Sequence, residues 1–307
     1  MKSTSALALI ISTWVLSSWV WGVTQAAEPS PGSSFKEWCQ QQASLSAEAR
    51  KTVEELLKEA GTSDCELAAK DLSSRTRLFL ENDQITDVSP LSGLTNLTEL
   101  YLNFSPITDV RPLAELTNLK KLGLYYNQIT DVSPLARLTN LTELYLRLNQ
   151  ITDVSPLARL TNLKWLDLDD NQIKDVSSLA RLTNLETLDL NNNQIKDLSP
   201  LAGLTNLTQL SLNNNQIKDV NPLAGLTNLS WLGLGNNPIK DVSPLAGLTN
   251  LKWLILSENQ ITDVSSLAKL TNLEELYLTD NPLAQSVCPI SPPTVCKFEE
   301  LPPAKTY

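Results

Sequence analysis

Leucine residues recur along most of the chain in a pattern that repeats every 22 positions. In the copy at 138–159 the pattern reads L-x-x-L-x-L-x-x-N-x-I and is carried by Leu141, Leu144, Leu146, Asn149 and Ile151. Leu144 and Leu146 alternate with polar or aromatic residues, and this period of two predicts a strand of three to five residues whose leucines point inward. A single coil cannot bury its leucines alone, so stacked coils must share one core.

A polar position follows each predicted strand and advances by 22 without a slip: Asp83, Ser105, Asn127, Asn149, Asn171, Asn193, Asn215, Asn237, Asn259 and Asn281. This column defines ten coils. The chain must turn inside the stack here, and an asparagine amide can pair with backbone groups that would otherwise be buried without a partner. We therefore interpret the asparagines as an internal structural ladder and not as a ligand site.

The segment that returns from each strand carries a recurrent proline, at Pro90, Pro112, Pro134, Pro156, Pro200, Pro222 and Pro244. Proline suits the first turn of a helix, and the few residues available favour 3₁₀ turns or single-turn helices on the convex side. The predicted fold is an α/β repeat: a right-handed solenoid of horseshoe form, with a parallel β-sheet on the concave face and an α-helical N-terminal cap.

Four segments are expected along the chain: a signal peptide at 1–27, a linker and helical N-terminal cap at 28–74, the repeat array at 75–283 and a C-terminal cap at 284–307. Lys2, an apolar run and the small residues Ala26 and Ala27 have the layout of a secretory signal. An uncleaved membrane anchor is the alternative. We expect cleavage, no stable membrane insertion afterwards, and a periplasmic, cell-surface or secreted protein.

Two helices are expected in the N-terminal cap. Ser46 is placed to cap a helix that runs to Ala60, with Gly61 just past its end. Ser63 and Glu66 have the spacing of a capping box for a second helix, through about Leu72. These helices would cover the first coil, because the end of a solenoid exposes core residues.

The four cysteines allow three pairings. Ten strands at roughly 4.8 Å spacing set the two ends of the array roughly 40 Å apart, which no disulfide can span. We therefore expect Cys39 to pair with Cys65 and Cys288 with Cys296, one disulfide in each cap, in an oxidising compartment. Four free thiols are the alternative.

The repeat LTNLTELYLRLNQITDVSPLAR resembles the internalin type of bacterial leucine-rich repeat. The caps, with Cys39 and Cys65 before the array and NPLAQSVCPISPPTVCKFE after it, are similar to those of exported leucine-rich repeat proteins of cyanobacteria. The resemblance covers most of the chain beyond the expected signal peptide and implies a protein-binding scaffold. The sequence shows no immunoglobulin-like domain after the repeats and no cell-wall sorting motif, so a role in host-cell adhesion is not implied.

The charge and residue types disfavour several functions. The absence of histidine excludes Ser-His, Cys-His and His-metal arrangements. The net charge of −10, which becomes −11 without Lys2, disfavours binding to nucleic acid. Aspartates at the position of Asp153 are interpreted as turn caps and not as a calcium ladder.

Asp167 and Asp189 occupy one outward column on adjacent coils, near the carboxylate spacing of retaining glycosidases. We expect an open face neither to exclude water nor to separate their pKa values. The sequence therefore predicts no enzyme, no cofactor and no metal site. Five N-x-S/T triplets, at Asn96, Asn103, Asn140, Asn206 and Asn228, are interpreted as by-products of the repeat.

The aromatic residues carry the functional prediction. The chain has 7 Trp, 6 Tyr and 4 Phe, and setting aside Trp14, Trp19 and Trp21 of the signal segment leaves 14. Ten fall at positions predicted to face outward from the concave side: Phe79, Tyr101, Phe104, Tyr125, Tyr126, Tyr145, Trp165, Trp231, Trp253 and Tyr277. Arg147 and Leu148 lie beside the rings, and Asp167 and Asp189 belong to a polar strip farther along.

Contiguous exposed aromatics mark interaction sites, and Tyr, Trp and Arg dominate protein interfaces. The leading hypothesis is a monomeric scaffold that binds a protein partner through its concave face. The alternative is a glycan, with the rings stacking on sugars and the aspartates accepting hydrogen bonds from hydroxyl groups. Strand propensity alone is the remaining explanation of the aromatics.

Overall fold

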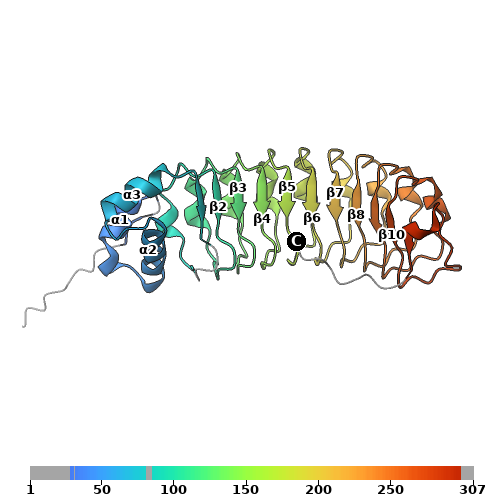
Figure 1. Ribbon diagram of the computed structural model, residues 1–307, viewed down its shortest axis with the longest axis horizontal. Helices are drawn as coiled ribbons and strands as arrows, with labels where there is room; N and C mark the ends of the chain where they lie inside the picture. Colours follow the sequence, from blue (N-terminus) through green and yellow to red (C-terminus); the bar gives the residue numbers. More distant parts are fainter. Residues whose placement is uncertain (1–27, 31, 81–84, 299–307) are drawn as a thin grey trace, which may run out of the picture.

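The computed structural model describes residues 28–30, 32–80 and 85–298. These residues form an elongated solenoid, with a helical cap at the N-terminal end and a parallel sheet along one side (Figure 1). The expected signal peptide and Asp83 of the ladder lie outside the described residues.

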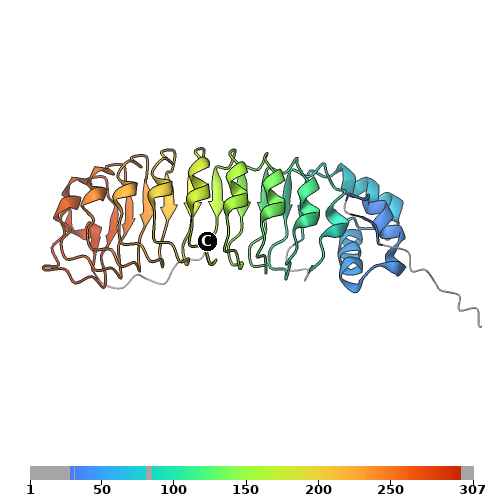
Figure 2. The ribbon, with the colours of Figure 1, turned by 180° about the vertical axis from the view of Figure 1, so that it is seen from behind.

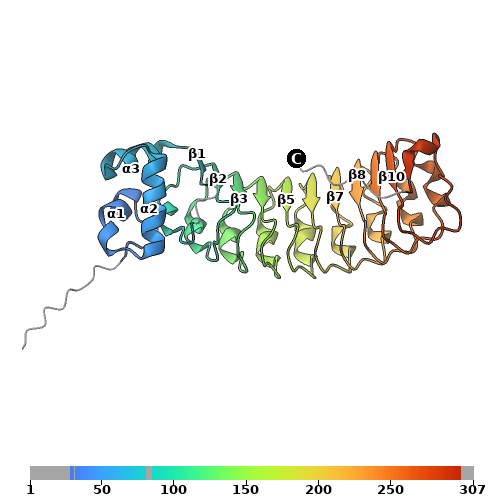
Figure 3. The ribbon, with the colours of Figure 1, turned by 60° about the horizontal axis from the view of Figure 1, so that its bottom comes forward.

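The sheet contains eleven parallel strands in chain order. They are β1 Arg77–Phe79, β2 Glu99–Tyr101, β3 Lys121–Gly123, β4 Glu143–Tyr145, β5 Trp165–Asp167, β6 Thr187–Asp189, β7 Gln209–Ser211, β8 Trp231–Gly233, β9 Trp253–Ile255, β10 Glu275–Tyr277 and β11 Cys296–Lys297. Ten of these strands were predicted from the repeat. The eleventh lies in the C-terminal cap, where the repeat pattern does not predict a strand. The sheet stays open along its whole length (Figure 3).

The opposite side carries short 3₁₀ turns, as expected from the prolines and the short return segments (Figure 2). Those of the array are η2 Ser89–Leu91, η3 Arg111–Glu115, η4 Ser133–Arg137, η5 Ser155–Arg159, η6 Ser177–Arg181, η7 Ser199–Leu201, η8 Asn221–Leu223, η9 Ser243–Gly247 and η10 Ser265–Lys269. Two more, η1 Gln42–Ser44 and η11 Pro293–Val295, lie in the caps. The carboxylate of Asp153 accepts a hydrogen bond from the backbone N–H of Ser155 at 2.8 Å, so the aspartate column does cap these turns.

The core is a stack of leucine, isoleucine and valine rows that runs through every coil. Leu144, Leu146 and Leu188 have no exposed surface. The asparagine ladder joins successive coils beside this core. The side chain of Asn149 donates to the carbonyls of Leu124 and Leu146 at 2.9 and 3.0 Å and accepts from the N–H of Ile129 at 3.0 Å. Each asparagine of the ladder thus satisfies backbone groups in two coils that water cannot reach. Ser105, at the same position in an earlier coil, has a buried hydroxyl without a hydrogen-bond partner among the described residues.

A second asparagine ladder follows each 3₁₀ turn and was not predicted. Its members donate from Nδ2 to the carbonyl of a residue 23 positions earlier, as Asn140 does to Thr117 at 2.8 Å. Four of the five N-x-S/T triplets start in this ladder, at Asn96, Asn140, Asn206 and Asn228. Their amide nitrogens therefore have a structural role. This agrees with our interpretation of the N-x-S/T triplets as by-products of the repeat.

The N-terminal end is covered by three helices, α1 Phe35–Gln40, α2 Ala47–Glu59 and α3 Cys65–Ser74. Ser46 caps α2 as predicted, and Gly61 follows it with a φ of 67°. The predicted capping box at Ser63 is wrong: Asp64 caps α3, because its carboxylate reaches the N–H groups of Glu66 and Leu67. None of the helices in the described ranges is long and apolar enough to cross a bilayer.

A capping box that the sequence reading missed lies at the start of α1, where Ser34 and Glu37 bond to each other's backbone N–H. Both expected disulfides are present, Cys39–Cys65 and Cys288–Cys296, each with a Cα–Cα distance of 5.6 Å. The first joins α1 to α3. The second joins Cys288 to Cys296 in β11, the strand that pairs with β10 at the end of the array.

Candidate functional site

The concave face is built from two outward columns of each three-residue strand, because the middle leucine points into the core. Strand register places Tyr145 beside Asp167 and Glu143 beside Trp165. Of the ten predicted aromatics, Phe79, Tyr101, Tyr145, Trp165, Trp231, Trp253 and Tyr277 lie in these columns. Phe104, Tyr125 and Tyr126 lie just past the strand ends.

The rings of the first five coils contact one another in three groups. Phe79 stacks on Tyr101 with ring centroids 4.9 Å apart. Phe104 meets Tyr125 edge to face at 4.7 Å. Tyr145 lies 6.2 Å from Trp165, at the end of this aromatic cluster.

Ion pairs in register flank the cluster on the same face. Arg77 binds Glu99 at 2.8 Å, and Lys121 binds Glu143 at 2.8 Å. The Arg77 guanidinium also lies 5.2 Å from the centre of the Phe79 ring. Phe79 remains 47% exposed and Trp165 39%, so large apolar surfaces face solvent beside fixed charges. Aromatic residues and arginine are enriched in protein interfaces.

The later coils present a sparser surface. Trp231 and Trp253 pair in register across β8 and β9. A Cβ at Gly233 would come within 2.7 Å of the Trp231 ring, so glycine at this position lets the indole lie across the strand. The aromatic surface is therefore densest toward the N-terminal half of the array.

The carboxylates of the polar strip have strongly altered pKa values. Burial raises the pKa of Asp167 to about 6 and that of Asp189 to about 7, although the N–H groups of Asp169 and Asn191 donate to them. We expected an open face neither to exclude water nor to separate the two pKa values. The first part is wrong, since burial is the largest cause of both raised pKa values, whereas the two values remain close to each other. Both values move in the same direction, whereas a glycosidase pair needs one acid and one base.

Arg147 partly neutralises the negative charge of this polar strip. Its guanidinium lies 3.1 Å from the carboxylate of Asp169, which is only 5% exposed. Asp170 is farther away, at 3.9 Å. Arg147 follows Tyr125 and precedes Asp169 in one column of the 22-residue repeat. Within the described ranges, no group of three or more acidic, cysteine or histidine side chains is arranged to hold a metal ion.

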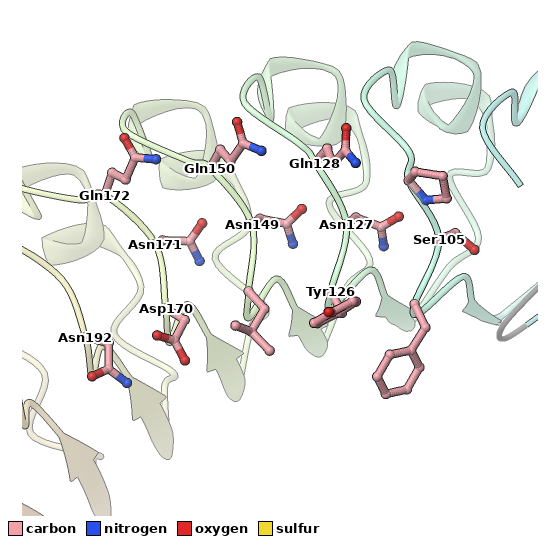
Figure 4. Close-up of a pocket in the computed structure, with 13 residues that line it drawn as sticks. Ser105, Tyr126, Asn127, Gln128, Asn149, Gln150, Asp170, Asn171, Gln172 and Asn192 are labelled. Atoms are coloured by element: carbon pink, nitrogen blue, oxygen red, sulfur yellow. The ribbon is translucent and has the colours of Figure 1, made fainter. Parts of the chain in front are cut away.

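A groove runs along the edge of the sheet, where the strands end (Figure 4). Its volume is about 620 Å³. Three rows of side chains form it, one residue of each row per coil: Gln128, Gln150 and Gln172; Asn127, Asn149 and Asn171; and Tyr126, Asp170 and Asn192. Phe104 and Leu148 also line it. We call this feature the edge groove.

The residues before the ladder positions have left-handed backbone conformations, from Phe104 before Ser105 to Asp280 before Asn281. Phe104, Tyr126 and Leu148 have φ values of 58, 57 and 55°. Asn192 and Asn214 hold the same position in later coils, with φ values of 50 and 55°. Asparagine tolerates this conformation, whereas an ordinary L-residue there costs roughly 1–2 kcal/mol.

Phe104, Tyr126 and Leu148 were predicted to lie on the concave face together with the strand residues. The glutamine row of the groove was missed altogether. Both features were visible as columns with a spacing of 22 residues, one on each side of the ladder asparagines. The left-handed turn between strand and ladder could not be predicted from residues such as Phe and Tyr, which rarely adopt it.

Comparison with known proteins identifies a repeat family and several similar solved structures. A family described as leucine rich repeats (2 copies) matches residues 76–115, 117–159, 161–203, 205–247 and 249–292. The chain is similar to internalin InlF of Listeria monocytogenes, with 36% identity, a TM-score of 0.65 and 76% of each chain covered. Internalin C2 of that organism has 41% identity and a TM-score of 0.61, over 68% of this chain and 91% of that one.

A more distant likeness shows the fold alone. The plant peptide hormone receptor RGFR1, solved in complex with RGF2, has 21% identity and a TM-score of 0.61, over 70% of this chain and 37% of the receptor chain. No curated protein matches the sequence.

Proposed function

The chain belongs to the leucine-rich repeat family, in its internalin type, and we propose that it is an exported scaffold that binds a protein partner through the concave face of its first five coils. Scaffolds of this family typically bind proteins and are not enzymes. The observation that carries the proposal is the aromatic cluster from Phe79 to Trp165 on an otherwise open sheet. Contiguous exposed rings on a soluble sheet face indicate an interface.

The geometry of the cluster supports a large, fixed binding surface. The core leucines hold the strands rigidly, so the rings lose little conformational freedom when a partner binds. Arg147, which is paired with Asp169, adds a positioned cation beside the rings. Arg and aromatic residues together are the usual hot spots of protein interfaces.

Export is proposed from two observations. The sequence at 1–27 has the layout of a signal peptide, and the caps each hold one disulfide. Disulfides form and persist in oxidising compartments. We propose a periplasmic, cell-surface or secreted location and a monomeric chain.

The proposal is tested by replacing Tyr125, Tyr145 and Trp165 together with Ala. We expect the variant to lose capture of a protein from envelope extract and to keep its melting temperature within a few degrees. A matched control replaces Gln209 and Ser211, which hold the two concave columns in a later coil, and should bind like the wild type. Capture that is undiminished in the triple variant contradicts the proposal.

A glycan is less suited to the concave face. Phe79 and Tyr101 are stacked almost parallel, at an interplanar angle of 2°, so each ring covers one face of the other. Tyr145 donates its hydroxyl to Glu143 at 2.9 Å. These contacts leave fewer free ring faces and hydroxyl groups for sugars than a row of separate rings would.

A further inference from the structure

Ion pairs along the sheet follow the strand register. A basic side chain bonds to an acid 22 positions later, in the next coil, in five pairs: Arg77–Glu99, Lys121–Glu143, Arg147–Asp169, Lys164–Glu186 and Lys252–Glu274. Asp167 and Asp189 depart from this pattern, since register places the two acids side by side in β5 and β6. Like charges directly opposite each other destabilise a sheet.

The fold does not account for these two charges. The same column holds Ser211, Gly233 and Ile255 in the following coils. Asp167 and Asp189 each accept one hydrogen bond from the backbone N–H two residues ahead, at 3.1 and 3.0 Å. An asparagine side chain accepts the same bond without a charge. The packing of the coil therefore leaves the acidity of both residues unexplained.

The described part of the chain supplies no ion-pair partner to either carboxyl group. Arg147 lies nearby, but its ion pairs are with Asp169 at 3.1 Å and Asp170 at 3.9 Å. The raised pKa values of Asp167 and Asp189 agree with this, because a cation beside the two groups would favour their charged forms. A positive group from another molecule would supply the charge that is missing here.

Two aromatic rings lie beside the two acids. Register places Tyr145 next to Asp167, and Trp165 lies two residues before Asp167 on the same outward side of β5. The two ring centroids are 6.2 Å apart, and Trp165 is 39% exposed. An aromatic face attracts a cation within about 6 Å of its centre. The chain itself makes this contact between Arg77 and Phe79, at 5.2 Å.

The arrangement favours an arginine over a metal ion or a lysine. Within the described ranges, no group of three or more acidic, cysteine or histidine side chains is arranged to hold a metal ion. Paired strands set Asp167 and Asp189 about 4.8 Å apart. The planar guanidinium of arginine can donate to two carboxylates and stack on an indole at the same time, whereas the ammonium of lysine is a compact charge that does not stack.

We propose that the protein partner of the concave face inserts an arginine side chain between Trp165 and the carboxylates of Asp167 and Asp189. The guanidinium stacks on the indole ring and donates hydrogen bonds to both acids. This inference rests on the proposed function, because the site is the end of the aromatic cluster. It adds that the partner presents a basic side chain, which complements the unpaired negative charge of β5 and β6.

NMR titration of the whole mature chain with three small probes tests the inference. The probes are the acetylated methylamides of arginine, of lysine and of citrulline, which has the shape of arginine without its charge. We expect the arginine probe to shift the indole N–H signal of Trp165, identified by its loss in Trp165→Phe, in a saturable way. The lysine probe should bind more weakly than arginine, and citrulline at least about tenfold more weakly. No saturable shift with arginine, equal binding of citrulline, or tighter binding of lysine overturns the inference.

Matched variants locate the binding. Asp167→Asn with Asp189→Asn removes two charges and keeps the oxygens that accept the backbone N–H groups, so it should stay folded and bind the arginine probe at least about tenfold more weakly. Glu258→Gln with Asp280→Asn also removes two charges from adjacent coils, at exposed positions near the far end of the array, and should leave the binding unchanged. Equal losses in the two variants would mean that only net charge matters, and would overturn the inference.

The inference and the proposed function fail in different experiments. Undiminished capture of protein by the variant of Tyr125, Tyr145 and Trp165 contradicts the proposed function, even where the arginine probe binds the wild type. The variant with asparagine at positions 167 and 189 should capture less protein than the wild type. Full capture by this variant, together with no binding of the arginine probe to the wild type, overturns the arginine site and leaves the concave-face proposal standing.

Discussion

Asp189 is the most perturbed carboxyl group of the concave face, and Asp189→Asn tests the cause of that perturbation. Burial raises its pKa to about 7, with a further contribution from the charges of Asp167 and Asp169. In the unfolded chain an aspartate has a pKa of about 3.9. Between these pH values the folded state keeps a proton that the unfolded state has released. The stability from Asp189 is therefore full below about pH 4 and is lost as the pH rises through about 7.

The size of the effect follows from the shift. A shift of about three pK units means that ionisation of Asp189 lowers the free energy of unfolding by at most about 4 kcal/mol above pH 7. Side chains on an open face relax and admit water, so we expect about 1–2 kcal/mol. Asp189→Asn cannot ionise, and its side-chain oxygen can still accept the hydrogen bond that Asn191 donates from its N–H at 3.0 Å. The variant should match the wild type near pH 4 and exceed it by about 1–2 kcal/mol at pH 8.

Urea denaturation across this pH range measures the difference. Asp175→Asn is the control of opposite sign, because hydrogen bonds from Ser177 lower the pKa of Asp175 and its ionised form stabilises the fold. That substitution should reduce stability at pH 7 and lose its effect in acid. A constant difference for Asp189→Asn at every pH, or destabilisation at pH 8, would refute burial as the cause.

Further substitutions test the scaffold. Leu188→Ala removes a fully buried side chain and should cost about 2–5 kcal/mol in thermal or urea denaturation; a cost no greater than that of changing Asp189 would reverse the inward and outward assignments. Asn149→Ala leaves the carbonyl of Leu124 and the N–H of Ile129 without this partner and should cost about 2–4 kcal/mol in the same assay, because unpaired buried groups are expensive. Cys39→Ser with Cys65→Ser should raise amide hydrogen exchange in α1 and α3 before the middle coils, since each coil contacts only its neighbours; uniform exchange along the array would contradict this.

The repeat made most of the fold predictable. A spacing of 22 residues sets the strands, the ladder and the turns together, because every coil must solve the same packing problem as its neighbours. The disulfides followed from the length of the stack. The start of α3 at Asp64 was missed because Ser63 and Asp64 both suit a helix cap, and only the backbone path separates them.

The candidate site was predictable in composition but not in shape. The pattern identified the outward aromatics, and the structure joins them into a cluster through contacts such as Tyr145 with Trp165. The sequence pattern could not show that Phe104 and Tyr126 have left-handed backbone conformations, since the coil imposes that conformation and not the residue type. The raised pKa of Asp189 was missed because the pattern places this residue on an open face and does not show how far its carboxyl group is buried.

Photo-crosslinking from a single concave position tests the central claim most directly. A benzophenone amino acid placed at Trp165, in β5, would report proteins that contact the aromatic cluster in the producing cell. The matched control places it at Arg159, which is exposed on the convex side in η5. We predict a discrete protein adduct from position 165 that is absent from position 159. Equal adducts from both positions, or none from position 165, would contradict protein binding through the concave face.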